Sequence, residues 1–144
     1  MQFSTFTIAS VLSLAASALA GTARVSNNCN ETVWLTVTRP TQTSTQYLLA
    51  SHGGNYSQPM TGTGNSLGVT KNSNYYSPDT PKLILGYSMA DNLQYWTVSS
   101  VNGDPMAGEG FVVHESDFSC SQATTYDGKT HTCGQGSDLT LFLC

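Results

Sequence analysis

Side chains able to do acid–base or metal chemistry are sparse in this chain, which has nine carboxylates and three histidines among 144 residues. The densest run is His114-Glu115-Ser116-Asp117, whose spacing matches neither the HExxH zinc motif nor an EF-hand calcium loop. On a strand, His114 and Ser116 would share one face and Glu115 would point the other way, and we expect a solvated strand end. His52 and His131 are predicted in loops, outside any metal-ligand pattern. These observations predict no catalytic residue, no metal and no cofactor.

The N-terminus carries the feature that sets the compartment. Residues 8–20 form an uncharged apolar run ending in Ala18-Leu19-Ala20, the small-x-small pattern that signal peptidase accepts. The run is too short for a comfortable transmembrane helix, which needs about 20 apolar residues. The sequence therefore predicts a secretory signal peptide over residues 1–20, one mature domain over residues 21–144, a secreted, extracellular location and no membrane attachment.

All four cysteines lie in the predicted mature domain, at positions 29, 120, 133 and 144. An even count behind a signal peptide predicts disulfides, and no pair has the C-x-x-C spacing of a zinc knuckle. Three connectivities are open. We favour a local bridge between Cys120 and Cys133, which bracket a Gly- and Thr-rich loop, and a long bridge between Cys29 and Cys144 that ties the first strand to the last.

The charge balance excludes two classes of partner. Only five residues are basic, the net charge is −4, and the basic residues form no cluster in the sequence. Nucleic-acid binding needs a basic footprint, and so does attachment to anionic lipid. The abundant Ser, Thr, Asn, Gln and Gly residues fit an extracellular, carbohydrate-facing surface. Two sequons, at Asn30 and Asn55, predict N-glycosylation.

The mature chain shows strand patterns and almost no helix patterns. Short β-branched or aromatic runs, several of them alternating, are separated by Gly, Asn, Ser and Pro. The predicted strands cover residues 23–26, 33–38, 46–49, 67–70, 82–88, 94–99, 110–114 and 139–143. Residues 53–81 are polar and weakly patterned, so we predict long loops there with one or two short strands. This spacing predicts an all-β sandwich or barrel.

Three segments resemble thaumatin-like proteins. Asn27-Asn28-Cys29-Asn30-Glu31-Thr32-Val33-Trp34 is similar to the opening of that family, and Tyr95 to Gly103 is similar to its "YDVSLVDG" strand and turn. The final strand matches the strand that carries the family's C-terminal cysteine, which bridges to its first cysteine. The small size and four cysteines resemble the fungal antigenic thaumatin-like group, the Blastomyces yeast-phase-specific proteins. The resemblance implies a thaumatin-like β-sandwich of one domain with two disulfides, outside the cell, with no settled enzymatic activity.

Larger thaumatin-like proteins carry an acidic cleft associated with β-1,3-glucan binding and weak hydrolysis, and glycoside hydrolysis requires two carboxylates. The resemblance places the cleft carboxylates at Gly86, Thr97 and Asn102, none of which is acidic. Asp104 could substitute for one of them, although a turn residue before Pro105 is the favoured interpretation. A weak β-1,3-glucan hydrolase is therefore an alternative and not the leading hypothesis.

Aromatic side chains could still stack on sugar rings. Trp34 and Tyr87 lie in strong strand patterns and are expected in the core, whereas Tyr56, Tyr75 and Tyr76 lie in polar segments and are expected to be exposed. The candidate ligand contacts are Asn102, Asp104, Tyr75 and Tyr76. We predict a secreted, non-enzymatic protein acting at the cell surface or host interface, with cell-wall polysaccharide or a host protein as its partner; the other alternative is a host-protein-binding effector.

Overall fold

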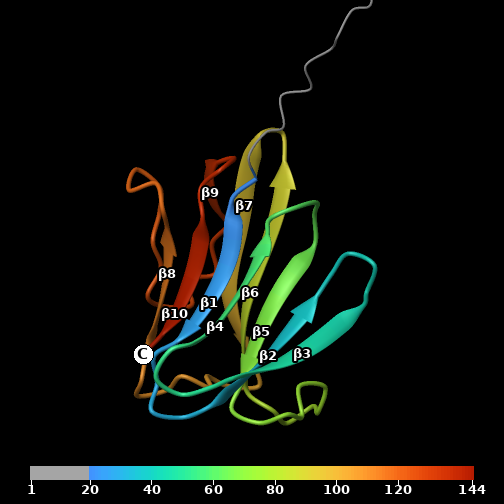
Figure 1. Cartoon of the computed structure of the whole chain (residues 1–144), viewed down its shortest axis with the longest axis vertical. Coiled ribbons are helices and arrows are strands. Elements are labelled where there is room, and N and C mark those ends of the chain that lie inside the picture. Colours follow the sequence, from blue (N-terminus) through green and yellow to red (C-terminus); the bar gives the residue numbers. More distant parts are fainter. Residues whose placement is uncertain (1–19) are drawn as a thin grey trace, which may run out of the picture.

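The computed structural model describes residues 20–144, which form ten strands in two sheets (Figure 1). The smaller sheet has the order β4 (Gly54–Pro59), β1 (Thr22–Asn27), β10 (Leu139–Leu143), β8 (Phe111–Glu115). The larger sheet has the order β3 (Ser44–Leu49), β2 (Val33–Thr38), β5 (Asn65–Thr70), β6 (Lys82–Ala90), β7 (Leu93–Val101), β9 (His131–Gly134). Within residues 20–144, no helix is long and apolar enough to cross a membrane. The predicted signal peptide lies outside the described residues except for Ala20.

The core lies between the two sheets, and it follows from the alternation of apolar and polar residues along each strand. In β10, the residues Leu139, Leu141 and Leu143 are fully buried, while the residues between them face outward. Val33, Leu35 and Val37 share the inner face of β2. The two sheets therefore bury one continuous hydrophobic cluster, and the all-β sandwich is confirmed.

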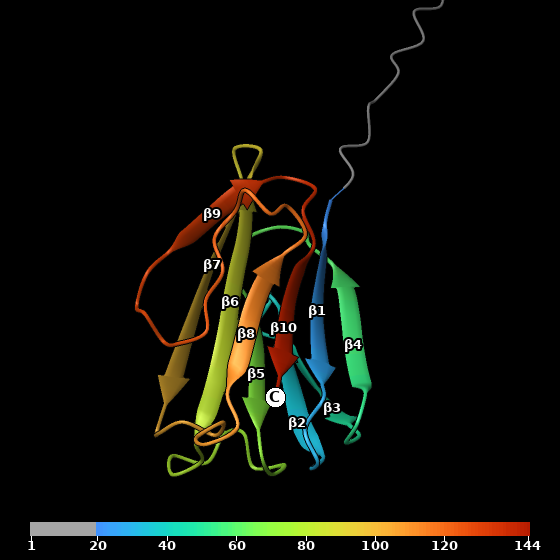
Figure 2. The same ribbon diagram turned by 90° about the vertical axis from the view of Figure 1, so that its left-hand side faces the viewer.

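The first and last strands lie side by side in the middle of the smaller sheet. Strand β1 pairs with β10 in parallel and with β4 in antiparallel, and β10 also pairs with β8. Figure 2 looks at this sheet, with β8, β10, β1 and β4 side by side. Cys144 directly follows β10, Cys29 lies two residues beyond the end of β1, and the two cysteines form a disulfide. The second disulfide joins Cys120 to Cys133, so both predicted bridges are confirmed.

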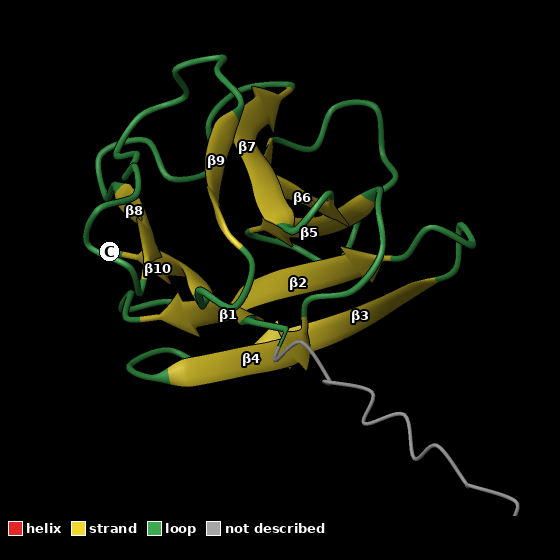
Figure 3. Cartoon of the chain, turned by 90° about the horizontal axis from the view of Figure 1, so that it is seen from above, coloured by secondary structure: helices red, strands yellow, loops and turns green. Residues whose placement is uncertain are grey.

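Side-chain contacts link the sheets at both edges of the sandwich. Seen from above, β3 and β4 lie next to each other at one edge (Figure 3). Tyr47 of β3 packs there against Tyr56 of β4, with ring centroids 4.7 Å apart. At the other edge, the Cys120–Cys133 bridge fastens the segment after β8 to β9. The four-stranded and six-stranded sheets are thus linked at each side.

The buried Asn27 gives a physical reason for the Asn-x-Cys spacing of the opening motif. Its side-chain amide donates hydrogen bonds to the carbonyls of Glu31, Leu49 and Ala50, at 2.9 to 3.0 Å, and its oxygen accepts the amide N–H of Cys29 at 3.1 Å. One buried side chain therefore bonds to backbone groups of the segment after β1 and of the end of β3, which ties the two together. The same residue sets the position from which Cys29 reaches Cys144.

The structure departs from the predicted strands in two places. Residues 53–81 contain two strands, the upper limit of the prediction, and β4 places Tyr56 in a strand where a polar loop was expected. Strand β9 was not predicted, and His131, expected in a loop, is its first residue. Both β4 and β9 are edge strands of polar sequence, stabilised by pairing with β1 and β7, so neither has a local apolar pattern.

Candidate functional site

The outer face of the smaller sheet carries a hollow of about 530 Å³, which we call the outer-face hollow. It follows from strand alternation, because every second residue of these four strands points away from the core. The paired registers place the outward side chains in two rows across β4, β1, β10 and β8. The first row is Asn55, Ser26, Phe142 and Val112, and the second is Ser57, Arg24, Thr140 and His114. The members of each row come from distant parts of the chain.

Aromatic rings and one ion pair define the lining of the outer-face hollow. Phe142 is 39% exposed and Phe118 is 85% exposed, and Phe118 meets His114 edge-on with ring centroids 5.5 Å apart. Arg24 and Asp138 form a salt bridge of 3.3 Å, and the Asp138 carboxylate also accepts the backbone N–H of Thr22. Because the two charges neutralise each other, the hollow has no net charge from this pair.

The outer-face hollow therefore combines an apolar wall with many neutral hydrogen-bonding groups. Hydroxyl groups come from Ser26, Ser57, Ser116 and Thr140, and an amide comes from Asn55. Ligand sites are typically concave and largely apolar, with a few polar groups that fix orientation. A sugar ring has a C–H face that packs on an aromatic ring and a rim of hydroxyls that donate and accept hydrogen bonds. The lining is suited to such a neutral, polyhydroxylated ligand.

Glu115 lies beneath this face, on the core side of β8. As predicted, it points away from His114 and Ser116, but the predicted solvated strand end is wrong, because Glu115 is only 1% exposed. Its Oε1 accepts hydrogen bonds from Gln94 Nε2 at 2.8 Å and from Trp96 Nε1. Burial raises the pKa of this carboxyl. Glu115 therefore joins the two sheets and has no access to a ligand.

All four predicted ligand contacts lie in the loops after β5 and β7, and none of them lines the outer-face hollow. Tyr76 is 72% exposed, as expected, and its hydroxyl donates to Ser44. Tyr75 was expected to be exposed, but it is 9% exposed because its ring covers Gly68. The Asn102 amide donates to the carbonyl of Thr80 at 3.4 Å. Of the two tyrosines expected to be exposed here, Tyr76 is exposed and Tyr75 is buried.

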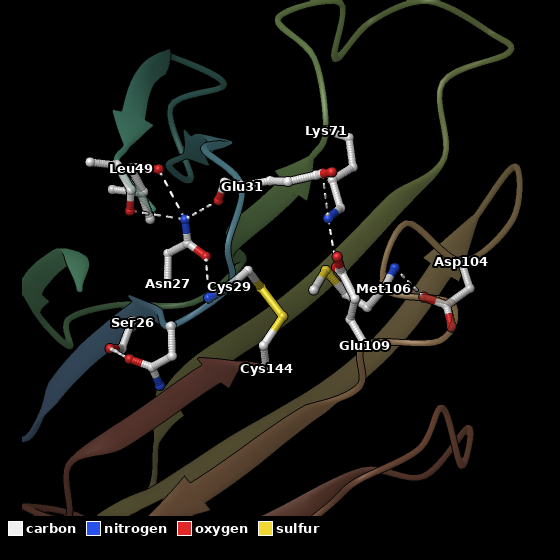
Figure 4. Close-up of a disulfide and its surroundings, with 12 residues drawn as sticks. Ser26, Asn27, Cys29, Glu31, Leu49, Lys71, Asp104, Met106, Glu109 and Cys144 are labelled. Atoms are coloured by element: carbon white, nitrogen blue, oxygen red, sulfur yellow. Dashed lines mark hydrogen bonds and ion pairs between the residues drawn. A yellow bond between two sulfur atoms is a disulfide. The ribbon is translucent and has the colours of Figure 1, made fainter. Parts of the chain in front are cut away.

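Asp104 has the turn role that the sequence favoured. It accepts the backbone N–H of Met106 at 2.8 Å and the hydroxyl of Tyr126, and burial followed by the Asp104 hydrogen bond raises the pKa of Tyr126. Asp104 and Glu109 line a second hollow of about 450 Å³. Glu109 pairs with Lys71 at 2.6 Å beside the Cys29–Cys144 disulfide (Figure 4). Both carboxylates thus bind groups of their own chain, as loop-stabilising residues do.

Two of the three positions at which the cleft carboxylates are missing, Gly86 and Thr97, lie on a different surface. Gly86 pairs with Thr97 across β6 and β7, and both line a hollow of about 270 Å³. Among the described residues that line it, none is a carboxylate. Asn102 does not line this hollow. This surface offers no acid and nucleophile for glycoside hydrolysis.

The structure also shows where a G-x-S-x-G segment and the aromatic residues expected in the core lie. The segment Gly64-Asn65-Ser66-Leu67-Gly68 has G-x-S-x-G spacing, but Ser66 lies within β5 and a loop follows, whereas a nucleophile elbow is a strand-to-helix turn. Trp34, expected in the core, is half-buried on the outer face of β2. The buried aromatic core residues of the larger sheet include Tyr87, as predicted, and Trp96.

Sequence reasoning missed Arg24, Phe118, Asp138 and Phe142. Only Phe142 had a local signal, because it occupies an outward position between the buried Leu141 and Leu143. A large apolar residue at such a position is informative when other exposed aromatic side chains surround it. Arg24 and Asp138 are 114 residues apart in the chain, so no local pattern could have paired them.

Comparison with known proteins identifies a family and a solved structure of similar fold. The family model for the Blastomyces yeast-phase-specific protein, Bys1, matches residues 9–144. The crystal structure of the protein elicitor MoHrip2 from Magnaporthe oryzae superposes with a TM-score of 0.71 and 21% sequence identity, covering 87% of this chain and 99% of the other. At this identity the likeness concerns the fold. Among curated proteins, none matches the chain significantly.

Proposed function

This chain belongs to the Blastomyces yeast-phase-specific protein family, and on that premise we propose that it is a secreted binding protein of the cell surface or host interface. We propose further that its ligand is a neutral cell-wall carbohydrate. The similar fold of a fungal protein elicitor supports a role at the host interface. The two disulfides support an extracellular location, because such bridges persist in oxidising compartments.

The observation that carries the carbohydrate proposal is the lining of the outer-face hollow. Phe142 and Phe118 supply aromatic surface, and Arg24, Asp138 and the surrounding hydroxyls supply donors and acceptors. The Arg24–Asp138 pair leaves the hollow without a strong charge of either sign. The net charge of −4 adds nothing that would attract a polyanion. A neutral polysaccharide fits this combination better than a nucleic acid or an anionic polymer does.

The finer fold assignment is also a proposal. We propose that the sandwich is a reduced thaumatin-like fold, which is supported by the Asn27-to-Trp34 and Tyr95-to-Gly103 motifs. The Cys29–Cys144 bridge between the first and last cysteines supports it as well. In this reduced form the positions of the acidic cleft are neutral, and the ligand face is proposed on the opposite, smaller sheet.

The test is retention of the secreted protein on insoluble β-1,3-glucan, chitin and mannan. We expect the wild type to bind at least one polysaccharide and Phe142→Ala to bind it about tenfold more weakly, which corresponds to a loss of about 1.4 kcal/mol. Tyr76→Ala is the matched control, because it removes an exposed ring outside the hollow. We expect it to bind like the wild type.

Two outcomes contradict the proposal. A folded wild-type protein that is retained on none of the three polysaccharides, even after its N-glycans are trimmed by endoglycosidase, is not a cell-wall carbohydrate binder, and the host-protein-binding effector then becomes the leading hypothesis. A Phe142→Ala variant that binds as tightly as the wild type places the ligand outside the outer-face hollow. Release of reducing sugar from the β-1,3-glucan, measured in the same samples, would favour the hydrolase alternative instead.

A further inference from the structure

We infer that an N-linked glycan on Asn55 lies across the outer-face hollow and shields it from other carbohydrates. The shielding of a ligand face rests on the proposed function, but the position of the glycan does not. The sequon Asn55-Tyr56-Ser57 lies on β4, at the edge of the smaller sheet. Asn55 and Ser57 both face outward and both line the hollow, while Tyr56 packs against Tyr47.

The Asn55 side chain is accessible to a glycosyl donor. It is exposed, and its amide makes a hydrogen bond of 3.2 Å to the carbonyl of Gly53. In the transfer, the amide nitrogen attacks the anomeric carbon of an oligosaccharide carried by a lipid diphosphate. The new bond joins nitrogen to carbon, the bond from that carbon to the phosphate oxygen breaks, the lipid diphosphate leaves with the electron pair, and the amide loses one proton. The modified nitrogen keeps one N–H.

The sheet register sets the distance from the attachment point to the aromatic wall. Asn55 pairs with Ser26, and Ser26 pairs with Phe142. Since neighbouring strands are about 4.8 Å apart, Asn55 and Phe142 are roughly 10 Å apart across the sheet. Phe118 contacts His114 of β8, one strand beyond Phe142 and about 14 Å from β4. An oligosaccharide of several units is longer than either span, so sugar rings attached to Asn55 reach Phe142 and Phe118. Covering these exposed rings removes apolar surface from water, which favours this position over free solution.

The second sequon provides a matched control on the same molecule. Asn30 is also exposed, but it lies in the loop between β1 and β2 and does not line the outer-face hollow. A glycan at Asn30 adds the same mass and chemistry outside the hollow. Effects common to any glycan therefore appear in both the Asn30→Gln and Asn55→Gln variants, whereas shielding appears only when Asn55 is changed.

The test is hydroxyl-radical footprinting of the protein secreted from a glycosylating host, before and after endoglycosidase treatment. Intact mass first establishes occupancy of Asn55. We expect Phe118 and Phe142 to oxidise severalfold more slowly in the glycosylated protein than in the trimmed protein or in Asn55→Gln. Tyr76 should oxidise at one rate throughout, and Asn30→Gln should keep the protection.

Each result either supports or overturns the inference. An unmodified Asn55, or rings that oxidise equally with and without the glycan, overturns it. Protection of Phe118 and Phe142 supports it even if no polysaccharide binds, in which case the proposed function alone fails. If polysaccharide binding occurs, the trimmed protein and Asn55→Gln should bind more tightly than the glycosylated wild type. Equal binding by glycosylated and trimmed forms would leave the proposed function intact and overturn the shielding.

Discussion

Glu115 is a carboxyl group held between two sheets by donors that both come from β7. Gln94 and Trp96 donate to the same oxygen, and among residues 20–144 the second oxygen of Glu115 and the side-chain oxygen of Gln94 have no partner. His131, stacked on Trp96 at 4.0 Å, and Asp117 are the nearby groups that affect its charge. Burial is the largest effect, and it raises the pKa of Glu115 because a buried anion is poorly solvated.

At the residue scale, this predicts a pH dependence of stability. At pH values just above 4.5, the ordinary pKa of a glutamate, Glu115 stays protonated in the native state but loses its proton in the unfolded state. The native state therefore binds more protons in this pH range than the unfolded state does. The free energy of unfolding should therefore fall as pH rises from about 4.5 through the raised pKa, and then level off. Glu115→Gln, which stays neutral and keeps the acceptor oxygen, should lose this fall. Urea unfolding followed by circular dichroism between pH 4.5 and 7.5 measures it.

The control for this prediction is Asp79→Asn, which neutralises an exposed carboxylate and should keep the wild-type slope. If the Glu115→Gln variant loses stability with rising pH as steeply as the wild type, Glu115 is not the cause of the pH dependence. Below pH 4 we expect the opposite slope, with the free energy of unfolding falling as the pH falls. Hydrogen bonds from Ser119 and Lys129 lower the pKa values of Asp117 and Asp127, respectively, so protonating these carboxylates costs stability. Both effects place the stability maximum on the acidic side of neutrality.

At the scale of elements, β5 depends on a glycine that lies under an aromatic ring. A Cβ added at Gly68 would lie 2.3 Å from Cε2 and 2.5 Å from the hydroxyl oxygen of Tyr75. The ring closes the loop between β5 and β6 against the outer face of β5, and it is buried in doing so. This contact explains why a loop tyrosine expected in solvent is not exposed.

We predict that Gly68→Ala lowers the free energy of unfolding by about 1–3 kcal/mol, because the added methyl group displaces a packed ring. The matched control is Gly134→Ala in β9, where a Cβ would have no neighbour within 4 Å, and the expected change there is small. In a Tyr75→Ala background the cost of Gly68→Ala should largely disappear. Additive costs in this double-mutant cycle, measured by urea unfolding, would show that the ring is not the cause.

At the scale of the whole molecule, the two chain ends form the centre of one sheet. The parallel pairing of β1 with β10 is a contact between residues more than 100 positions apart, and such contacts require a large loss of chain entropy. The Cys29–Cys144 bridge spans 115 residues and the Cys120–Cys133 bridge spans 13. The long bridge thus restricts the unfolded chain far more than the short one.

We predict that replacing Cys29 and Cys144 by alanine costs more stability than replacing Cys120 and Cys133. The chain-entropy relation gives nearly 5 kcal/mol for the long loop and about 3 kcal/mol for the short one. Midpoints and slopes of urea unfolding for both double variants and the oxidised wild type give the comparison. A larger loss from the short bridge would show that local contacts of that loop, and not chain entropy, determine its contribution.

Much of the fold could be predicted from local patterns. The alternation in residues 33–38 and 139–143 agrees with the faces that lie in the core. The Asp91–Asn92 dipeptide forms the β6–β7 turn with positive φ at both residues. The even cysteine count and positions agreed with the observed bridges. These features depend on neighbours in the chain or on a covalent bond between two residue types, so a single sequence is enough to predict them.

The candidate site depended on information of another kind. The outer-face hollow gathers residues 24–26, 55–57, 114–118 and 138–142, and its rows exist only because β4, β1, β10 and β8 pair in one register. A shift of one residue would turn every side chain of a strand to the other face.

The sequence by itself determined an all-β, disulfide-bridged chain. The tertiary pairing decided that Phe142, Arg24 and Asn55 meet on one surface and that Glu115 is buried beneath it, because cross-strand neighbours are set by register and not by proximity in the chain.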